Sequence, residues 1–466
     1  MQLWETIKSQ LLSYPAKTLS DGNITYSYEE ALKHAESLAE ELNYPCYGIL
    51  CSSELNTAIA LLACMAADVI AIPLSYRYGE AHCNRIIKRA SLRYVIADDE
   101  NNDELIIRQI SDQHFVKPEG EQPALIMYTS GTTGYPKGAM ISQSNLLCNL
   151  NDIKQYFQIK TTDRILICRP LYHCAVLTGE FLISIMNGLD IVFYNGDFNP
   201  FALCQAIGTY SITVVGGTPT LFYHAALMER RLKKCQSLRI IVTSGECMTP
   251  VIASAIRKSF PTVDIYNVYG LTEASPRVSY LAPQFFDEYC TSVGVPLDSL
   301  QAKVVSNDGV ELPSGDDGEL IISGDSIMLG YYNDQEMTDQ KIRQGWLYTG
   351  DIASISEEGF ITVKCRKDNM IIKAGINIYP QEIENVVKQC GGIREAYVYA
   401  DHNEQGRLII HLVVESIGIE QSVISQYCRE NLPVYEVPDV IHIVESIPKN
   451  GSGKILRKKR EEAGDS

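Results

Sequence analysis

Apolar runs alternate with amphipathic stretches along the chain up to about Ser292. Short apolar runs such as Ile165–Cys168 and Arg239–Thr243 predict buried strands. The segments Pro200–Gly208 and Pro219–Arg231 carry apolar residues at helical spacing and predict helices. Strands that alternate with helices in this way are typical of α/β layers around largely parallel sheets.

The pattern changes twice beyond that point. From Ser292 onward, short strands and turns indicate a β-rich and more antiparallel region. After about Lys367 the elements form a smaller strand–helix unit, with a helix expected from Pro380. We therefore predict an α/β fold: a large N-terminal domain, residues 1–366, of layered sheets plus a β-rich subdomain, and a small α+β C-terminal domain, residues 367–466.

The composition is that of a globular protein, since 45% of the 466 residues are hydrophobic and 21% are charged. The net charge of −17 argues against nucleic acids and anionic membranes as partners. The first residues lack a signal-peptide layout, and Asp68 interrupts the apolar stretch Leu61–Ile72. We therefore expect a cytoplasmic protein without a transmembrane segment. Fourteen scattered cysteines without paired spacing predict reduced thiols rather than zinc ligands.

Candidate chemistry begins with the segment Tyr128–Gly138, which follows the apolar run Ala124–Met127. It combines hydroxyl side chains, three glycines and Lys137. Glycines let backbone N–H groups approach an anion, hydroxyls donate further hydrogen bonds, and lysine adds a charge. Pro136 precedes the lysine and glycine follows it, unlike the common P-loop. The segment indicates a loop that closes over a polyphosphate, with a polar surface turn as the alternative.

Four further segments carry clustered polar residues: Asn267–Glu273, Trp346–Asp351, Arg366–Pro380 and Pro448–Arg457. Taken singly, each could be a helix end, a hairpin, a linker or a tail. Taken in this order with the first loop, they resemble the adenylate-forming superfamily of acyl- and aryl-CoA synthetases, peptide-synthetase adenylation domains and luciferase. The resemblance extends from about Ala124 to Arg457.

The resemblance implies a reaction in two halves. A carboxylate attacks the α-phosphate of ATP to give an acyl-adenylate and pyrophosphate, and a thiol then takes the acyl group as a thioester. The implied cofactors are ATP, Mg²⁺ and either CoA or the phosphopantetheine of a separate carrier protein. The C-terminal domain is expected to be mobile and to rotate about a hinge at Asp368 between the halves.

The resemblance also implies a role for each motif residue. The β- and γ-phosphates are expected to contact Thr129, Ser130, Gly131, Thr132, Thr133, Gly134 and Lys137. Adenine, ribose and the nearby phosphate are expected to contact Gly245, Glu246, Cys247, Asn267, Tyr269, Asp351 and Arg366. Thr272 corresponds to the α-phosphate contact and Glu273 to the Mg²⁺ ligand. Lys454 corresponds to the catalytic lysine that neutralises charge during adenylation, and Lys373 and Gly375 would approach the thiol after rotation.

The segment Pro170–Gly179 resembles the substrate side of the site, with His173 near the carboxylate. Cys174 stands where amino-acid-activating relatives have an aspartate, so α-amino acids are expected to be poor substrates. The same resemblance places Val176, Gly217, Gly270 and Leu271 in the acid pocket. Gln143 stands where many relatives have a histidine, and we expect no effect on ATP binding.

These expectations favour an acid–thiol ligase that uses a fatty or aryl acid and CoA. The alternative is a stand-alone adenylation enzyme that loads an aryl, fatty or amino acid onto a separate carrier protein in secondary-metabolite or siderophore biosynthesis. A scaffold that has lost catalysis is disfavoured because Lys454, Glu273 and Asp351 are intact. Nothing in the sequence supports a luciferase-like oxygenase, and the oligomeric state stays open.

Overall fold

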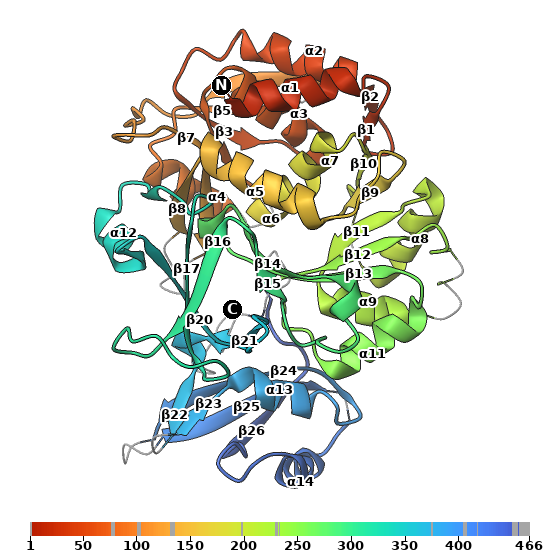
Figure 1. Cartoon of the computed structure of the whole chain (residues 1–466), viewed down its shortest axis with the longest axis vertical. Coiled ribbons are helices and arrows are strands. Elements are labelled where there is room, and N and C mark those ends of the chain that lie inside the picture. Colours follow the sequence, from red (N-terminus) through yellow and green to blue (C-terminus); the bar gives the residue numbers. More distant parts are fainter. Residues whose placement is uncertain are drawn as a thin grey trace. The chain divides into compact units, whose positions relative to one another are not determined.

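The computed structural model describes residues 2–75, 80–99, 104–130, 136–196, 199–228, 232, 234–373, 376–403, 408–416, 418–449 and 455. Its contacts divide the chain into two compact units whose segments alternate along the sequence. The first comprises Met1–Lys303, Ile321–Thr349 and Ser356–Thr362, and the second comprises Val304–Leu320, Gly350–Ile355 and Val363–Ser466 (Figure 1). Each unit has its own hydrophobic core.

The larger sheet of the first unit has nine strands in the order β15-β14-β13-β12-β11-β9-β10-β1-β2. The strands are β1 Thr18–Ser20, β2 Thr25–Ser27, β9 Arg164–Ile167, β10 Asp190–Phe193, β11 Val214–Gly217, β12 Ile240–Thr243, β13 Asp264–Gly270, β14 Arg277–Leu281 and β15 Val295–Pro296. The strands from β1 to β13 in this order run parallel. β2 pairs antiparallel with β1 at one edge, and at the other edge β14 pairs antiparallel with both β13 and β15. The strands predicted from apolar runs are therefore confirmed here.

A second sheet of the first unit has seven strands in the order β18-β8-β7-β4-β3-β5-β6. The strands are β3 Cys46–Leu50, β4 Ile70–Pro73, β5 Tyr94–Asp98, β6 Leu105–Gln109, β7 Pro123–Ser130, β8 Pro136–Ser142 and β18 Gly330–Tyr331. β7 and β8 form an antiparallel hairpin around the predicted phosphate loop. β18 then pairs with β8, so a segment almost two hundred residues later lies beside that loop.

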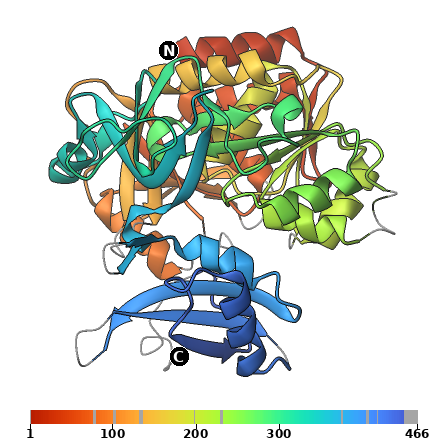
Figure 2. The same cartoon turned by 60° about the horizontal axis from the view of Figure 1, so that its bottom comes forward.

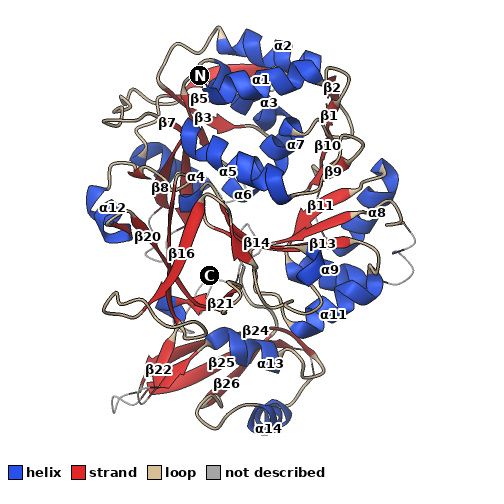
Figure 3. Cartoon of the chain, viewed as in Figure 1, coloured by secondary structure: helices blue, strands red, loops and turns tan. Residues whose placement is uncertain are grey.

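Helices surround these sheets (Figure 3). They are α1 Gln2–Ser13, α2 Tyr28–Ala39, α3 Glu54–Ala66, α4 Glu80–Arg89, α5 Gln143–Tyr156, α6 Cys174–Val176, α7 Ile183–Met186, α8 Pro200–Tyr210, α9 Pro219–Ala226, α11 Pro250–Ser259 and α12 Gln335–Lys341, with the π-helix η2 Leu177–Leu182 and the 3₁₀ turns η3 Thr272–Ala274 and η4 Pro283–Phe285. Ser27 and Ser142 form capping boxes that start α2 and α5. Asn199, Thr218 and Thr249 cap helices that begin with proline.

Helix α3 lies inside the core of the first unit. Every residue from Leu55 to Met65 is buried, which is the pattern of a helix enclosed on all sides. α1 and α5 lie side by side above this region (Figure 2). Among the described residues, none of the helices is both long and apolar enough to cross a membrane.

The predicted β-rich region is a five-stranded sheet in the order β16-β17-β20-β19, with β21 paired to β20. Its strands are β16 Leu300–Val305, β17 Gly318–Gly324, β19 Ile342–Arg343, β20 Trp346–Ile355 and β21 Ile361–Arg366. Pairing within it is antiparallel where β19 meets β20. The expected β-rich region is therefore present, although β17 and β20, with seven and ten residues, are longer than the short strands expected.

The remaining part of the second unit is a small α+β structure. Its elements are η5 Lys367–Asn369, β22 Ile371–Lys373, β23 Ile376–Ile378, α13 Pro380–Val387, β24 Ile393–His402, β25 Leu408–Ser416, α14 Gln421–Asn431 and β26 Val440–Val444. β24 and β25 are antiparallel, β25 and β26 are parallel, and α13 packs against β24. Ile383 and Val387 of α13 join Ile410 and Leu412 of β25 in its core.

Candidate active site

The predicted phosphate loop lies at the end of the β7–β8 hairpin. Thr129 of β7 pairs with Lys137 of β8, so these two residues face each other where the loop begins and ends. Both are partly buried. Gly131, Thr132, Thr133 and Gly134 lie outside the described residues, as does the side chain of Ser130.

Lys137 points toward a tyrosine from a distant part of the chain. Its ammonium nitrogen lies 5.9 Å from the ring centroid of Tyr331 and 3.5 Å from the sulfur of Met337. The Tyr331 hydroxyl in turn donates a hydrogen bond to Oε1 of Glu273 over 2.7 Å. Tyr331 therefore connects the lysine of the phosphate loop with the predicted Mg²⁺ ligand.

Thr272 and Glu273 lie on the 3₁₀ turn η3, directly after β13. The turn is tight because the Leu271 N–H donates to the Pro276 carbonyl over 2.9 Å. A Cβ atom on Gly270 would lie 2.3 Å from that carbonyl oxygen, so only glycine fits there. The carbonyl of Glu273 also accepts a hydrogen bond of 2.9 Å from the N–H of Met328. Backbone and carboxylate of Glu273 are thus both held in place.

The predicted adenine contacts lie at the carboxyl ends of three neighbouring strands in the nine-stranded sheet. β11, β12 and β13 are parallel neighbours in which Gly217, Thr243 and Asn267 occupy matching positions. Their carboxyl ends, and the loops that follow them, therefore lie together. Tyr269 is partly buried at the end of β13, and Gly245 follows β12 with φ of +87°, a conformation that favours glycine.

Asn267 uses its side-chain amide within the fold. Its Oδ1 accepts from the Thr243 hydroxyl over 3.0 Å, and its Nδ2 donates to the Ser292 carbonyl over 2.7 Å. The side chain is buried, with 1% of the residue exposed. Glu246 is exposed, and its carboxylate accepts from the N–H of Thr220 at the start of α9. The Asn267 side chain therefore links β13 to β12 and to Ser292, and the Glu246 side chain links the loop after β12 to α9.

The predicted acid side of the site is a short helical segment. His173 is partly buried just before α6, with its ring centroid 4.3 Å from that of Tyr172. Cys174 is buried, and burial raises the pKa of its thiol to about 12. Val176 is fully buried, and α6 then widens into the π-helix Leu177–Leu182, a form of helix that is frequent at functional sites.

An ion pair joins the partly buried Arg169 to Glu180, which is buried on the π-helix. Arg169 also donates to the hydroxyl of Ser244 over 3.1 Å. A Cβ atom on Gly216 would lie 2.4 Å from Oε1 of Glu180, so glycine makes room for the pair. Neither residue was predicted from the sequence. The signal that could have found them is Glu180 itself, a single charge inside the apolar run from Val176 to Met186.

The second unit holds the other predicted site residues. Asp351 of β20 is buried, and its Oδ1 lies 3.1 Å from Nη1 of Arg366 at the end of β21. Asp368 lies in the short turn η5. Lys373 ends β22 with its ammonium 3.0 Å from Oδ2 of Asp439. Gly375 and Lys454 lie outside the described residues.

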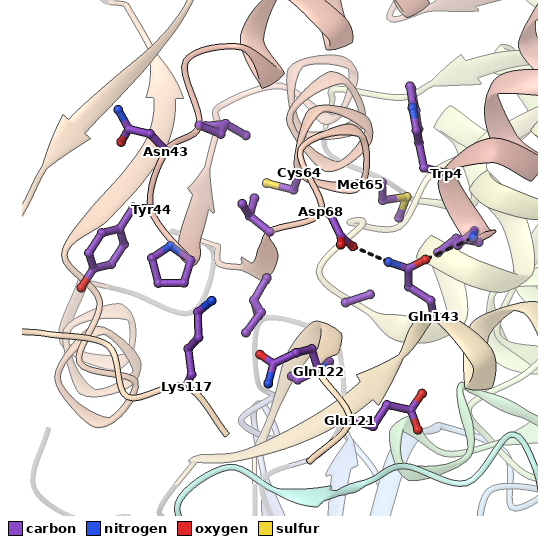
Figure 4. A pocket seen from close by; sticks show the side chains of 17 residues that line it. Trp4, Asn43, Tyr44, Cys64, Met65, Asp68, Lys117, Glu121, Gln122 and Gln143 are labelled. Atoms are coloured by element: carbon purple, nitrogen blue, oxygen red, sulfur yellow. Dashed lines mark hydrogen bonds between the residues drawn. The ribbon is translucent and has the colours of Figure 1, made fainter. Parts of the chain in front are cut away.

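A separate cavity of about 570 Å³ lies in the first unit, lined by residues such as Trp4, Tyr44 and Met65 (Figure 4). It adjoins the first residues of β7, whereas the phosphate loop follows the last ones. Gln143 lines it, donating to Asp68 over 2.6 Å and accepting from the N–H of Leu3 over 3.2 Å. Gln143 therefore ties α1 and the α3–β4 turn to the start of α5.

Comparison with protein families agrees with this arrangement. Residues 7–332 match the AMP-binding enzyme family, and residues 382–454 match the AMP-binding enzyme C-terminal domain. The chain belongs to the AMP-binding enzyme family. The resemblance to adenylate-forming enzymes that the five motifs indicate is confirmed.

Curated relatives of this AMP-binding enzyme include several CoA ligases. A long-chain-fatty-acid–CoA ligase of Escherichia coli O6:H1 is 35% identical over 360 residues, which are 75% of this chain and 64% of the relative. A feruloyl-CoA synthase of an Amycolatopsis species is 29% identical over 418 residues, or 85% and 84% of the two chains. The 2-succinylbenzoate–CoA ligase of Bacillus subtilis is 26% identical and covers 94% of this chain and 93% of its own. The chain thus matches less than two thirds of the length of the first relative.

Solved structures share the fold of this AMP-binding enzyme. The o-succinylbenzoate CoA synthetase of Bacillus subtilis, in complex with its acyl-adenylate, aligns with a TM-score of 0.86 at 23% identity over 99% of this chain and 98% of its own. ATP-bound MatB from Rhodopseudomonas palustris aligns with a TM-score of 0.83 at 21% identity over 97% of both chains. The predicted α/β fold, with a large N-terminal and a smaller C-terminal domain, is therefore confirmed.

Proposed function

We propose that this AMP-binding enzyme is an AMP-forming acid–thiol ligase. It would join a carboxylic acid to the α-phosphate of ATP, release pyrophosphate, and pass the acyl group to the thiol of CoA with release of AMP. The relatives named as CoA ligases support this activity. The observation that carries the proposal is the connection from Lys137 through Tyr331 to Glu273, which joins a cation and a carboxylate from separate motifs.

The phosphates would lie at the end of the β7–β8 hairpin. Thr129 and Lys137 face each other there, and the hydroxyls and glycines from Ser130 to Gly134 complete the loop in the sequence. Within the described part of the chain, Lys137 has a cation–π contact and no carboxylate partner, so its charge can turn to a phosphate at low cost. Lys137 would hold the leaving pyrophosphate and thereby lower the barrier to its departure.

Glu273 is the residue that we propose to hold Mg²⁺. Its carboxylate is partly buried and oriented by Tyr331, and carboxylate oxygen is a preferred ligand of this hard cation. When bound, the ion would neutralise phosphate charge. Thr272, one residue earlier on the same turn, would donate its hydroxyl to an oxygen of the α-phosphate.

The nucleoside would lie at the carboxyl edge of β12 and β13. We propose that Tyr269 stacks on adenine and that the backbone of Gly245–Cys247 lines the pocket. Asn267 would act as a positioning residue, because its amide already bonds to Thr243 and Ser292. Asp351 would accept hydrogen bonds from the ribose hydroxyls, and its ion pair with Arg366 would orient it.

The catalytic lysine and the hinge are carried over from the family pattern. Lys454 would neutralise the charge that grows on the phosphate and carboxylate oxygens during adenylation. We propose that the chain divides at residues 366 and 367 and that Asp368 is the hinge. Its place in the three-residue turn η5, between β21 and β22, supports this, since such turns are frequent connectors and hinges. Lys373 and Gly375 would approach the thiol after rotation.

The acid would lie against α6, the π-helix and the ends of β11 and β13. His173 would sit near the reacting carboxylate, and Cys174, Val176, Gly217, Gly270 and Leu271 would line the pocket. The high pKa of Cys174 keeps its thiol neutral, so an α-ammonium group would find no counter-charge there. This supports the expectation that α-amino acids are poor substrates.

The proposed acceptor is CoA, and ATP and CoA are both compatible with a cytoplasmic location. A separate carrier protein with a phosphopantetheine arm is the alternative from the sequence. The two acceptors can be separated by offering the purified enzyme, ATP, Mg²⁺ and an active acid together with either CoA or a loaded carrier protein. Formation of acyl-CoA at a rate that matches pyrophosphate release supports the proposal, and acyl transfer to the carrier alone contradicts it.

A further inference from the structure

Arg277 is a buried cation next to Gly270 and Gly179, two residues of the segments proposed to hold the acid. It opens β14, directly after the turn that carries Thr272 and Glu273, and its Cα pairs with that of Gly270. Only 6% of the residue is exposed. A permanently charged guanidinium at this depth costs free energy unless an anion pairs with it.

Two groups in contact with the guanidinium of Arg277 are neutral. Its Nη1 donates to the hydroxyl of Tyr156, and burial raises the pKa of that tyrosine to about 12, so the phenol keeps its proton. A Cβ atom on Gly179 would lie 2.8 Å from Nη2, so the guanidinium lies directly against the backbone of the π-helix. Among the residues that the structure describes, no carboxylate forms an ion pair with Arg277.

Three acidic residues lie within four positions of these contacts, and each has a partner elsewhere. Asp152, four residues before Tyr156, accepts a hydrogen bond from the hydroxyl of Ser299. Glu180, next to Gly179 on the π-helix, pairs with Arg169. Glu273, on the turn before Arg277, accepts a hydrogen bond from Tyr331. The charge of Arg277 is therefore left for a group that enters the pocket.

We propose that the acid substrate is a dicarboxylic acid whose second carboxylate pairs with Arg277. This inference rests on the proposed function. The reacting carboxylate would lie near Thr272 and His173, and the far end of the acid would reach the guanidinium beside Gly179. A carboxylate can accept two parallel N–H hydrogen bonds from arginine, which fixes orientation as well as charge.

The same geometry disfavours acids with a wholly apolar tail. An alkyl or phenyl end placed against Arg277 would exclude water from the guanidinium without replacing its hydrogen bonds. The second carboxylate thus acts as a specificity group, because the site is built to hydrogen-bond it and rejects an analogue that lacks it.

The test uses matched pairs of acids, each a dicarboxylic acid and its monomethyl ester, over aliphatic and aromatic spacers of increasing length. The rate of pyrophosphate release gives kcat/KM for each acid with the full-length enzyme and the variants Arg277→Leu and Arg277→Lys. For the spacer that fits, we expect the enzyme to prefer the diacid by about 100-fold, as for loss of a buried charge partner. Arg277→Leu should remove that preference by lowering kcat/KM for the diacid and raising it for the half-ester, which no longer desolvates an unpaired guanidinium, and Arg277→Lys should keep part of the preference.

Two results would overturn the inference. One is a half-ester that is as good as its diacid throughout the panel. The other is Arg277→Leu lowering kcat/KM equally for both acids of a pair while the thermal midpoint is unchanged, which would place the reacting carboxylate on Arg277. Failure of the proposed function looks different, because no acid of any kind would then stimulate pyrophosphate release.

Discussion

The hydroxyl of Tyr331 donates to Oε1 of Glu273 over 2.7 Å, although 58 residues separate them in the sequence. Tyr331 is buried on the short strand β18, which pairs with β8 beside the phosphate loop. The hydrogen bond therefore joins the hairpin of Lys137 to the turn of Glu273. Any change in this bond should affect the metal-dependent part of the reaction more than the binding of the acid.

Tyr331→Phe tests that relationship. Losing a hydrogen bond to a charged carboxylate costs about 1.5 kcal/mol, so the Mg²⁺ concentration for half-maximal pyrophosphate release should rise roughly 10-fold. The KM for the acid should stay unchanged. Tyr332→Phe is the matched control, because the Tyr332 hydroxyl donates to the carbonyl of Val116 instead. A Mg²⁺ dependence equal in the two variants would contradict the role given to Tyr331.

The ion pair between Arg169 and Glu180 predicts a loss of stability on Glu180→Ala. Removing one partner leaves Arg169 without its counter-charge, and such losses cost about 3 kcal/mol in the free energy of unfolding. Denaturant unfolding of the whole enzyme measures this. Asp287→Ala is the control, since the Asp287 side chain is 69% exposed and its pair with Arg257 should contribute less than about 1 kcal/mol. An equal change in the free energy of unfolding for the two substitutions would contradict the larger contribution assigned to the pair of Arg169 and Glu180.

The raised pKa of Cys174 predicts slow alkylation. Its thiol has a pKa of about 12 in the fold, so at pH 8 the reactive thiolate is a minor species. Unfolding would return the pKa to about 8.5, so this group contributes stability that is present below pH 8.5 and lost as the pH rises toward 12. Iodoacetamide labelling followed by peptide mapping should modify the partly exposed Cys247 first, and ATP should protect it. Faster labelling of Cys174 than of Cys247 would contradict this.

Lys454→Ala separates the two half-reactions. If Lys454 stabilises the charge that develops during adenylation, its loss should reduce acid-dependent pyrophosphate release by at least about 100-fold. Formation of acyl-CoA from a pre-formed acyl-adenylate should be largely retained, because the proposed rotation about Asp368 moves the lysine away for that step. Lys449→Ala is a nearby control, since Lys449 pairs with Glu395 on the small domain. Equal loss of both half-reactions in Lys454→Ala would argue against the rotation.

The strands that precede the candidate site residues could be predicted from the sequence, because each has the apolar pattern of a buried strand. The run Ala124–Met127 has the pattern of a buried strand, and it lies within β7. The apolar run after Arg239 likewise predicted β12, whose last residue, Thr243, pairs with Asn267 of β13.

Contacts between distant segments could not be predicted in the same way. Tyr331 lay in an unremarked segment, and only the pairing of β18 with β8 brings it to Glu273. Glu180 and Arg277 each stood as one charge within apolar sequence, without a spacing that names a partner. Gln143 was noticed as a departure from the family, yet its bonds to Asp68 and Leu3 depend on how α1, α3 and α5 pack.

The central claim is that this enzyme activates a carboxylic acid with ATP and passes it to CoA. The most direct measurement follows radiolabelled ATP with the purified enzyme, Mg²⁺, CoA and the panel of acids, and identifies the nucleotide and acyl products together. The account predicts acid-dependent formation of AMP, pyrophosphate and acyl-CoA in equal amounts, with dicarboxylic acids the most active. Acid-dependent formation of ADP and phosphate, or no acid-dependent turnover of ATP at all, would contradict it.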